Sequence, residues 1–399
     1  MARRGVAILV VVLAGSPHAA RAAPELPLGP RSLDERRSSA QLTPAVRWTR
    51  IVREGGPWRV NVLRIAPGAP VVVAPAGDSV GVRSRPSAIG RRLAAVAAVN
   101  GGYFAADGNP VGVLAGAGAL LSEPVGGRSA LTLGAERPRV NALRFAGAVT
   151  VGDETRLLDG VNRRPGVVPA CGGRGGDRPT ERPDAAATCT DPSELVLFTA
   201  DWGRRAPAAG SYLQVREDAV TALGRSAIPE DGFVLAATGG AARYLRRTAA
   251  VGTDVEQNLE LDSPRGPLAG GALAGILGGG PRLVARGRIR VRAAAEGFAP
   301  LSAPWFYRSF VAARNPRTLA GVREDGTLLL VTVDGRRAGW SAGVTLPEAA
   351  RVMRALGARD ALNLDGGGSS AMTVRGKVAS RPSDATGERA VSDALVVLP

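Results

Sequence analysis

The sequence has very little histidine and lysine, two of the side chains that carry protons in catalysis. It contains one histidine, His18, and one lysine, Lys377, among 399 residues. Residues 1–23 have the pattern of a secretory signal, with two arginines before a short apolar stretch and a small-x-small cleavage site at residues 20–22. Removal of this signal leaves no imidazole, which excludes histidine-based nucleophilic catalysis and histidine-ligated zinc. Carboxylates remain as the main acids and bases.

Cysteine is nearly as scarce, with only Cys171 and Cys189 in the chain. They flank a polar, glycine- and proline-containing segment that offers little to bury. In an exported protein the simplest prediction is a disulfide that closes this loop and stabilises the fold by about 3 kcal/mol. A two-cysteine metal site without histidine is the less favoured alternative.

Long hydrophobic runs are missing after the signal. No later segment approaches the ~20 apolar residues of a membrane-spanning helix. The sequence therefore predicts a secreted or periplasmic protein with no stable membrane span. An uncleaved N-terminal anchor is disfavoured because the apolar part of the signal is short.

Aromatic residues are also few, at 4% of the chain, whereas positive charge is abundant. The formal net charge is +16, or +13 once the three arginines of the signal are removed. Such a charge raises nucleic acid as a partner. However, the arginines are scattered and there are too few aromatic rings for base stacking. We interpret the charge as a preference for anionic substrates and do not expect nucleic-acid binding.

The order of apolar runs and turn signals predicts one compact α+β domain of mixed or antiparallel sheet, with a few helices and glycine-rich site loops. Residues 24–45 lack periodicity and are expected to be a linker, so the folded domain is expected to span residues 46–399. Residues 162–190 are expected to be an irregular insertion. Residues 58–65 alternate like a strand. Thr345 and Glu348 form a capping box that starts a helix ending at Gly357.

The most informative stretch is residues 361–372. A short apolar strand ends at Asp365, which is followed by three glycines, residues 366–368, and by Ser369 and Ser370. Glycine amides can surround an anionic oxygen closely because no Cβ intervenes. The alternative is a mobile hairpin turn in a glycine-rich protein. The sequence of strand, carboxylate, glycines and hydroxyls favours a functional site.

Three further segments carry candidate residues. A small-residue strand ends at Asn100, before two glycines and Tyr103, although on its own this pattern fits a simple turn. Arg314 and Arg317 flank a proline-fixed turn and could bind a phosphate or carboxylate through their guanidinium groups, with a surface role as the equal alternative. Asp334 precedes a glycine and is by default a hairpin turn residue.

Five motifs together resemble those of the phosphodiester glycosidase family. They are Asn100-Gly101-Gly102-Tyr103-Phe104, Gly279-Gly280-Pro281-Arg282-Leu283-Val284, residues 314–321, Asp334-Gly335-Arg336 with the helix that follows, and Asn363-Leu364-Asp365-Gly366-Gly367-Gly368-Ser369. The resemblance covers roughly residues 90–399, and five motifs in the family order are far more specific than one. The 162–190 insertion and residues 201–273 do not match a family motif.

The resemblance implies hydrolysis of a sugar 1-phosphodiester at the anomeric carbon. Asp365, Asn100 and Arg317 are then the implied catalytic group, with Asp365 as base or nucleophile. The implied substrate- or phosphate-binding residues are Gly366, Gly367, Gly368, Ser369, Tyr103, Gly101, Gly102, Arg314, Thr318, Asn363 and Asp334. A phosphomonoester is a good leaving group because its second pKa is about 6, so a single carboxylate can carry the reaction where ordinary glycosidases need two.

Two other functions fit the same residues. The protein could bind phosphodiester-containing envelope glycans without turnover, or it could be a phosphodiesterase that cleaves the P–O bond. The sequence requires no cofactor, and although a divalent cation held by Asp365 is chemically compatible, no carboxylate cluster demands one. The expected partner is a small or polymeric sugar phosphodiester.

Overall fold

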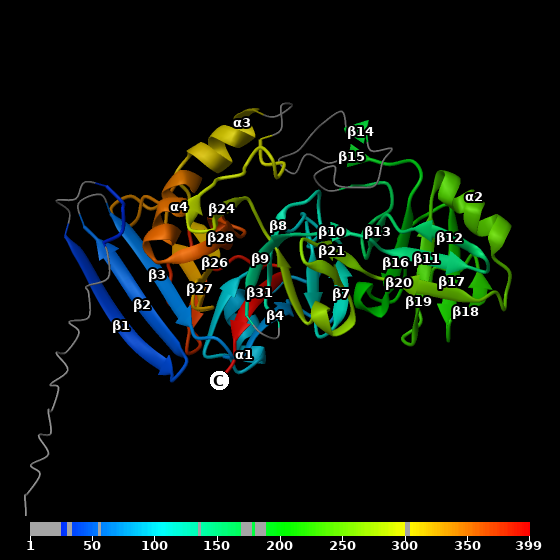
Figure 1. Ribbon diagram of the computed structural model, residues 1–399, viewed down its shortest axis with the longest axis horizontal. Coiled ribbons are helices and arrows are strands. Elements are labelled where there is room, and N and C mark those ends of the chain that lie inside the picture. The colour runs from blue at the N-terminus through cyan, green and yellow to red at the C-terminus, as the bar shows by residue number, and fades with distance from the viewer. Residues whose placement is uncertain are drawn as a thin grey trace, which may run out of the picture.

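The computed structural model describes residues 25–29, 34–54, 57–134, 137–168, 178–179, 189–299 and 304–399. The molecule is elongated, and its first strands lie at the opposite end from the strands drawn in green (Figure 1). Antiparallel sheets dominate and helices are few. The predicted antiparallel sheet with few helices is therefore confirmed, whereas the described part of the chain is β-rich and does not show the predicted α+β class or a single domain.

The largest sheet has eight strands and carries the Asp365 segment at one of its strand ends. Its spatial order is β1 (Glu35–Thr43), β2 (Val46–Arg53), β3 (Trp58–Ile65), β27 (Leu328–Val333), β26 (Arg317–Arg323), β28 (Ala358–Asn363), β24 (Arg282–Ala285) and β25 (Arg288–Ile289). The predicted strand over residues 58–65 is confirmed. Asp325 lies in the turn that joins β26 to β27, and its Oδ1 accepts the Thr327 amide at 3.0 Å.

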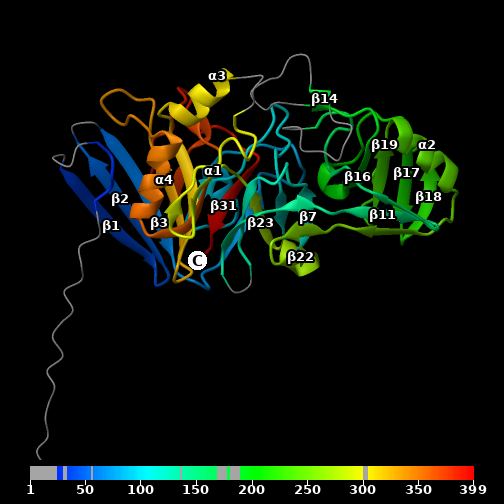
Figure 2. The ribbon, with the colours of Figure 1, turned by 45° about the horizontal axis from the view of Figure 1, so that its top comes forward.

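Helix α4 (Leu346–Ala355) covers one face of this sheet beside β28 (Figure 2). The Thr345 hydroxyl accepts the Glu348 amide at 3.1 Å, and the Glu348 carboxylate accepts the Thr345 amide at 2.9 Å. Both bonds satisfy amides that a helix start would otherwise leave unpaired. Val352 and Met353 are fully buried against the sheet. The predicted helix and its capping box are confirmed.

Two five-stranded sheets pack behind the eight-stranded sheet. One has the order β30 (Lys377–Val378), β29 (Met372–Val374), β5 (Ala97–Asn100), β31 (Asp393–Val397) and β4 (Val71–Pro75), and the other β7 (Ala119–Ser122), β6 (Leu114–Gly116), β23 (Gly275–Gly278), β8 (Ser129–Thr132) and β9 (Arg139–Ala142). Helix α1 (Pro86–Arg92) contacts β5. Leu362, Val99 and Leu277 come from the three sheets and share one core. The sheets therefore fix the ends of β5, β23 and β28 against one another.

Residues 143–168 and 195–268 form most of the far end of the molecule, and we call these two ranges the outer region. Its strands are β10 (Arg144–Phe145), β11 (Ala148–Val151), β12 (Glu154–Leu157), β13 (Gly160–Val161), β16 (Leu195–Thr199), β17 (Ser211–Arg216), β18 (Ala219–Leu223), β19 (Gly232–Ala237), β20 (Val255–Asn258), β21 (Leu261–Ser263) and β22 (Gly266–Leu268). Helix α2 (Gly239–Thr248) packs on β17 and β19. The hydrophobic core of the outer region continues into the sheet that contains β6, β23 and β8, through Ala115, Ala130 and Ile276.

The folded chain begins earlier than the sequence predicted. Residues 24–45 were expected to be a linker, but β1 occupies Glu35–Thr43 and pairs with β2, so that expectation is wrong for these residues. Arg53, which is 2% exposed, anchors this segment by donating to the Leu26 carbonyl at 2.8 Å and to Glu35 at 3.1 Å. The signal lies outside the described residues.

The predicted disulfide also involves the insertion. Cys171 lies outside the described residues, so its pairing with Cys189 stays a prediction. Cys189 begins β15 (Cys189–Thr190), which pairs with β14 (Arg178–Pro179), and it is buried. It also exchanges two backbone hydrogen bonds with Val168, at 2.8 and 2.9 Å.

Candidate active site

Asp365 lies just beyond the end of β28 and is held in place by two other segments. The Leu364 amide donates to the Thr318 carbonyl at 2.9 Å, and the Asp365 amide donates to the Gly101 carbonyl at 3.1 Å. The Asn100 side chain donates to the Asp365 carbonyl at 2.9 Å. The backbone on both sides of the carboxylate is therefore fixed by β26 and by the end of β5.

The Asp365 carboxyl is half-buried and titrates abnormally. Burial raises its pKa from 3.8 to about 6, although Ser369, the Gly366 amide and Arg389 favour the charged form and Asp393 opposes it. The Gly366 amide donates to Asp365 Oδ1 at 2.8 Å. A carboxylate that ionises near neutral pH is suited to accept a proton during catalysis.

The glycine loop does not surround an anion in the way the sequence suggested. The Gly366 amide is engaged by Asp365, and the Gly367 amide donates to the Pro316 carbonyl at 2.9 Å. At most the Gly368 amide of the three is left for a ligand. Gly367 has a φ of +59°, and a Cβ there would lie 3.1 Å from Arg336 Nη1. The glycines thus permit a tight turn and the close approach of side chains.

Three buried polar atoms beside Asp365 lack hydrogen-bond partners among the described residues. They are the hydroxyl oxygens of Ser369 and Ser370 and the Oδ1 of Asn363. Ser369 is near enough to Asp365 to lower its pKa, but no partner meets the geometry of a hydrogen bond. Buried polar groups are nearly always satisfied, so unsatisfied ones need an explanation such as a bound ligand or water.

Asn100 and Thr318 act as a structural clamp under the site. Both are 0% exposed, and the Thr318 hydroxyl donates to Asn100 Oδ1 at 2.6 Å. The same oxygen accepts the Ala371 amide at 3.1 Å. With its Nδ2 on the Asp365 carbonyl, the Asn100 side chain is occupied by protein groups on both sides. Its place fits the ordering of Asp365 better than contact with a sugar.

Gly101 and Gly102 are needed because a second carboxylate packs against them. A Cβ on Gly101 would overlap the Asp393 carboxylate, and the Gly102 amide donates to Asp393 Oδ1 at 2.7 Å. Asp393 is 1% exposed, and burial raises its pKa. Sequence reasoning missed this residue, which lies at the start of β31 and bears no motif of its own.

Tyr103 and Asn363 form a hydrogen-bonded pair at the wall of the site. Asn363 Nδ2 donates to the Tyr103 hydroxyl at 2.6 Å, and that hydroxyl donates to the Gly280 carbonyl at 2.6 Å. Burial first, then the Asp365 charge, raises the Tyr103 pKa. The Tyr103 ring lies 5.6 Å from Phe298 and 6.2 Å from Phe310, centroid to centroid. An aromatic wall thus stands next to the carboxylate.

Arg317 and Arg314, the two arginines that the sequence suggested as anion ligands, make different contacts in the structure. Arg317 is 1% exposed, donates to the Val344 carbonyl at 3.1 Å and lies over the Phe310 ring. Burial lowers its pKa to about 10. Its Nη1 has no hydrogen-bond partner among the described residues and is the one nitrogen left for a ligand. Arg314 instead forms a two-pronged ion pair with Glu348 at 2.7 to 3.2 Å and lies over the Trp58 ring.

Two exposed arginines that sequence reasoning missed lie over the glycine loop. Arg336 donates to Asn315 Oδ1 at 2.7 and 3.0 Å and places its Nη1 at Gly367. Arg389 pairs with Asp384 at 2.9 and 3.1 Å, and a Cβ on Gly368 would overlap this pair. Arg336 has a left-handed backbone conformation, with a φ of +56°, which its Asp-Gly-Arg motif did not predict.

Asp334 is not an exposed turn residue, and its side-chain hydrogen bonds join it to Trp340 and Arg381 and not to the residues that hold Asp365. It is 4% exposed, and its carboxylate accepts the Trp340 indole at 2.9 Å and the Arg381 amide at 3.1 Å. Burial raises its pKa. The geometry gives it a structural role, and its predicted contact with substrate has no support from these bonds.

Neither a metal-binding cluster nor a membrane-spanning helix is found in the described part of the chain. They contain no group of three or more Asp, Glu, His or Cys side chains placed to hold a metal ion. Within the same ranges, no helix has the length and apolar character required to cross a bilayer.

Comparisons with known proteins agree with the motif analysis. Residues 208–398 match the family model described as phosphodiester glycosidase, so the resemblance to this family is confirmed over that segment. The Asn100 motif lies outside the matched segment. Asp365, its glycine loop, Arg336 and Arg389 all lie within it.

Three relatives show how far the likeness extends. The structure of a predicted exported protein from Burkholderia pseudomallei K96243 is 29% identical with a TM-score of 0.82, over 94% of this chain and 98% of the other. A hypothetical protein from Synechocystis shares the fold, with 22% identity and a TM-score of 0.69 over 90% of this chain and 63% of that one. The SPbeta prophage-derived protein YomE of Bacillus subtilis (strain 168) is 43% identical over 84 residues, which is 21% of this chain and 13% of YomE.

Proposed function

We propose that this protein is an exported hydrolase that cleaves the glycosidic bond of a sugar 1-phosphodiester. The observation that carries the proposal is the Asp365 carboxylate, which has a pKa raised to about 6 and is followed in the same loop by two buried serine hydroxyls, Ser369 and Ser370, that have no partner among the described residues. The family match over residues 208–398 supports the reaction class. The signal-like N-terminus and the description of the Burkholderia relative support export to the periplasm or the medium.

In this proposal Asp365 acts on water or on the sugar itself. As a base, it takes a proton from water while the water oxygen bonds to the anomeric carbon. The bond from that carbon to the phosphate oxygen breaks, and its electron pair leaves with the phosphomonoester. As a nucleophile, Asp365 would bond to the anomeric carbon while the phosphomonoester leaves with the electron pair of the broken carbon–oxygen bond, and water would then hydrolyse the sugar–Asp365 ester to release the sugar and the carboxylate.

The leaving group explains why one carboxylate is enough. A phosphomonoester has a second pKa of about 6 and needs little protonation as it departs. Its negative charge can be met by Arg336 and Arg389, which lie over the glycine loop. Charge-assisted hydrogen bonds from guanidinium groups to phosphate are among the stronger polar contacts in proteins. Arg317 Nη1 and the Gly368 amide are further donors that could bind the phosphate.

The sugar would occupy the space between Asp365 and the aromatic wall. Tyr103 is the ring of this wall that can face a sugar, since Phe310 stacks on both Phe298 and Phe306, and Ser369 and Ser370 have hydroxyl oxygens with no partner among the described residues. Asn100, Thr318 and Asp393 act in this proposal as positioning residues that fix the backbone around Asp365.

Hydrolysis in ¹⁸O-labelled water tests the reaction. The proposal expects the label in the released sugar, because water attacks carbon. Label in the phosphate would mean cleavage of the P–O bond by a phosphodiesterase. Binding of the sugar 1-phosphodiester without any product would mean a non-catalytic binder of envelope glycans. Either of the last two results would overturn the glycosidase proposal.

A further inference from the structure

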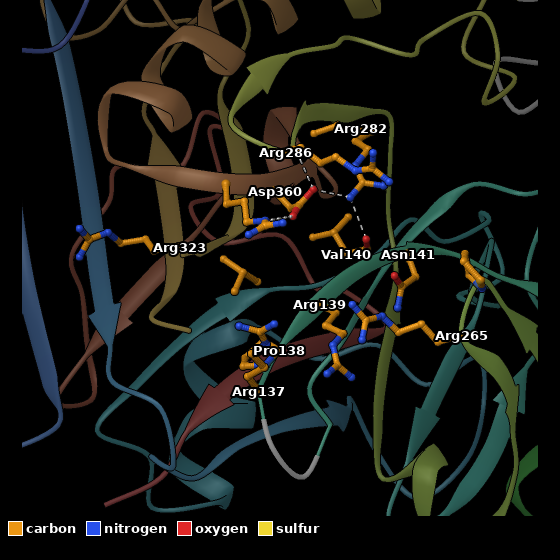
Figure 3. A pocket seen from close by; sticks show the side chains of 14 residues that line it. Arg137, Pro138, Arg139, Val140, Asn141, Arg265, Arg282, Arg286, Arg323 and Asp360 are labelled. Carbon is orange, nitrogen blue, oxygen red and sulfur yellow. Dashed lines mark hydrogen bonds and ion pairs between the residues drawn. The ribbon is translucent and has the colours of Figure 1, made fainter. Parts of the chain in front are cut away.

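A cavity with an unusual concentration of arginine lies away from the glycine loop. Its volume is about 390 Å³, and it opens between β24, β28 and the chain around residues 137–141 (Figure 3). Seven arginines line it: Arg137, Arg139, Arg265, Arg282, Arg286, Arg323 and Arg359. Asp360 is the one acidic residue among the lining residues. The cavity wall therefore carries a large excess of positive charge.

Part of this charge is neutralised by ion pairs. Arg282 contacts Asp360 at 2.6 Å and also donates to the Val140 carbonyl at 2.8 Å, as Figure 3 shows. Arg323 pairs with Asp325 at 3.2 Å, and Arg359 pairs with Glu324 and Asp360.

Three of the other lining arginines have guanidinium groups without an ion pair among the described residues. Arg137, Arg265 and Arg286 are exposed, and of these only Arg286 contacts a carboxylate, through its backbone amide, which donates to Asp360 Oδ1 at 3.2 Å. Cationic side chains held around one cavity repel each other, and a bound anion would relieve that repulsion.

The positive surface continues beyond this cavity. A second cavity of about 720 Å³ shares Arg282 and Arg286 and adds Arg288, Arg290 and Arg292. The amides of Arg290 and Arg292 donate to the carbonyls of Leu283 and Arg282, so this chain runs extended beside β24. Alternate residues of an extended chain lie on one face about 7 Å apart. The arginines thus form a row along which a chain of anionic groups could lie.

This row is physically linked to the candidate active site. Asp360 and Asp365 are five residues apart on β28 and its continuation, roughly 16 Å at the rise of an extended chain. β24, which carries Arg282, pairs with β28 and follows the Gly280 segment that contacts Tyr103. A polymer bound at Asp365 would need to span only a few repeats to reach the arginines.

We propose that this arginine-lined cavity, with its row, binds further phosphates of a polymeric phosphodiester substrate. The proposal rests on the proposed function, since it takes its ligand class from the reaction at Asp365. A polymer of sugar or polyol phosphates fits better than nucleic acid, because none of the described residues lining either cavity is aromatic. The cavity then supplies affinity for the chain, while Asp365 acts on one bond.

Binding of glycerol phosphate oligomers of one, three and six units to the full-length mature protein tests this site. These probes contain no glycosidic bond, so their binding does not depend on catalysis. The test variant is Arg137→Ser/Arg265→Ser/Arg286→Ser. The matched control is Arg204→Ser/Arg225→Ser/Arg243→Ser, which removes the same charge from exposed positions in the outer region.

We expect affinity to rise with oligomer length in the wild type and to fall about tenfold or more for the six-unit probe in the test variant. The control should change by about twofold at most, because remote exposed charges are screened by salt. Both variants should hydrolyse a monomeric sugar 1-phosphodiester at the wild-type rate. If the wild type does not hydrolyse the sugar 1-phosphodiester at all, the proposed function is overturned, whereas the result of the binding measurement still stands.

Three outcomes would overturn the polymer site. Equal weakening in the test and control variants would reduce the effect to net charge. Inorganic phosphate binding as tightly as the six-unit probe would reveal a site for a single ion. Single-stranded DNA of the same charge binding as tightly would show that the surface does not select the substrate class.

Discussion

The surroundings of Asp365 differ sharply from a second buried polar cluster, around Arg163 in the outer region. Arg163 is 3% exposed and donates to Glu123 at 2.7 Å, to Glu194 at 3.0 Å and to the Asp159 carbonyl at 2.9 Å. The far oxygen of Glu123 accepts the Val161 amide. Every charge there meets an opposite charge or a backbone group. Around Asp365, by contrast, three buried polar atoms have no partner among the described residues.

The contrast separates a structural network from a functional site. Both regions contain a carboxyl with a pKa raised to about 6 mainly by burial, Asp365 in one and Asp159 in the other. A raised pKa alone therefore does not identify a catalytic group. Unused hydrogen-bonding capacity and arginines over an open loop distinguish the Asp365 region.

The largest expected difference is in turnover. Asp365→Asn keeps the shape of the side chain and removes its charge, so turnover of a sugar 1-phosphodiester should fall by about 10² to 10⁴-fold. Asp159→Asn should leave the rate unchanged, because it affects a carboxyl with the same raised pKa outside the site. Release of the phosphomonoester measures both. Near wild-type turnover in Asp365→Asn would end the catalytic assignment.

The free energy of unfolding should depend more on the Arg163 cluster than on the Asp365 region, which is the reverse of the expectation for turnover. Arg163→Met leaves the Glu123 and Glu194 carboxylates buried without their cation, and such a loss costs about 3 to 5 kcal/mol in the free energy of unfolding. Arg389→Met breaks only the exposed pair with Asp384 and should cost about 1 kcal/mol or less. Urea unfolding of the two variants gives the comparison. Equal costs would contradict the view that the outer cluster is the structural one.

The pH dependence should show the Asp365 ionisation in both activity and stability. The carboxylate must be charged to act, so the rate should rise through pH about 6, and this limb should persist in Asp159→Asn. The folded pKa lies above the unfolded value of 3.8, so the associated stability is complete below pH 3.8 and is lost as the pH rises through 6.

Removing this ionisation should therefore stabilise the protein at neutral pH. Relative to wild type, Asp365→Asn should gain up to about 3 kcal/mol above pH 6 and nothing below pH 3.8. Unfolding at several pH values measures the difference. A gain that does not change with pH would mean that the Asp365 pKa is ordinary.

A smaller effect is expected from the backbone of the glycine loop. Gly367 has a φ of +59° and touches Arg336, so Gly367→Val should destabilise the fold by about 1 to 3 kcal/mol and weaken substrate binding. Gly376→Val, with a φ of +74° and open space around it, should cost similar stability without affecting binding. Measuring KM and unfolding for both variants separates backbone strain from the loss of the arginine contact.

The parts of the site that the sequence predicted are those with strong local signals. The capping box at Thr345 and the strand leading to Asp365 depend on residues a few positions apart, and both are present. Asp393, Arg336 and Arg389 come together only through the packing of separate strands and loops, which no local pattern reveals. The same holds for β1, whose mostly polar strand is fixed by the Arg53–Glu35 pair. The Gly366 and Gly367 amides looked free in sequence because Asp365 and Pro316 take them only in the folded loop.

The smallest effect, and the most direct test of the contrast, compares two serines that are both 0% exposed. The Ser341 hydroxyl donates to the Asp334 carbonyl at 2.6 Å, whereas the Ser369 hydroxyl has no partner among the described residues. Ser341→Ala leaves a buried carbonyl unsatisfied and should cost about 1 to 2 kcal/mol of stability, with turnover unchanged. Ser369→Ala loses no such bond in the free protein, so its free energy of unfolding should change by less than about 0.5 kcal/mol. Its kcat/KM for a sugar 1-phosphodiester should fall about five- to tenfold, because the hydroxyl finds its partner only in the substrate complex. If Ser369→Ala instead loses stability and keeps its kcat/KM, the unpartnered hydroxyl belongs to the packing of the loop, and the Asp365 region would be a structural network like that around Arg163.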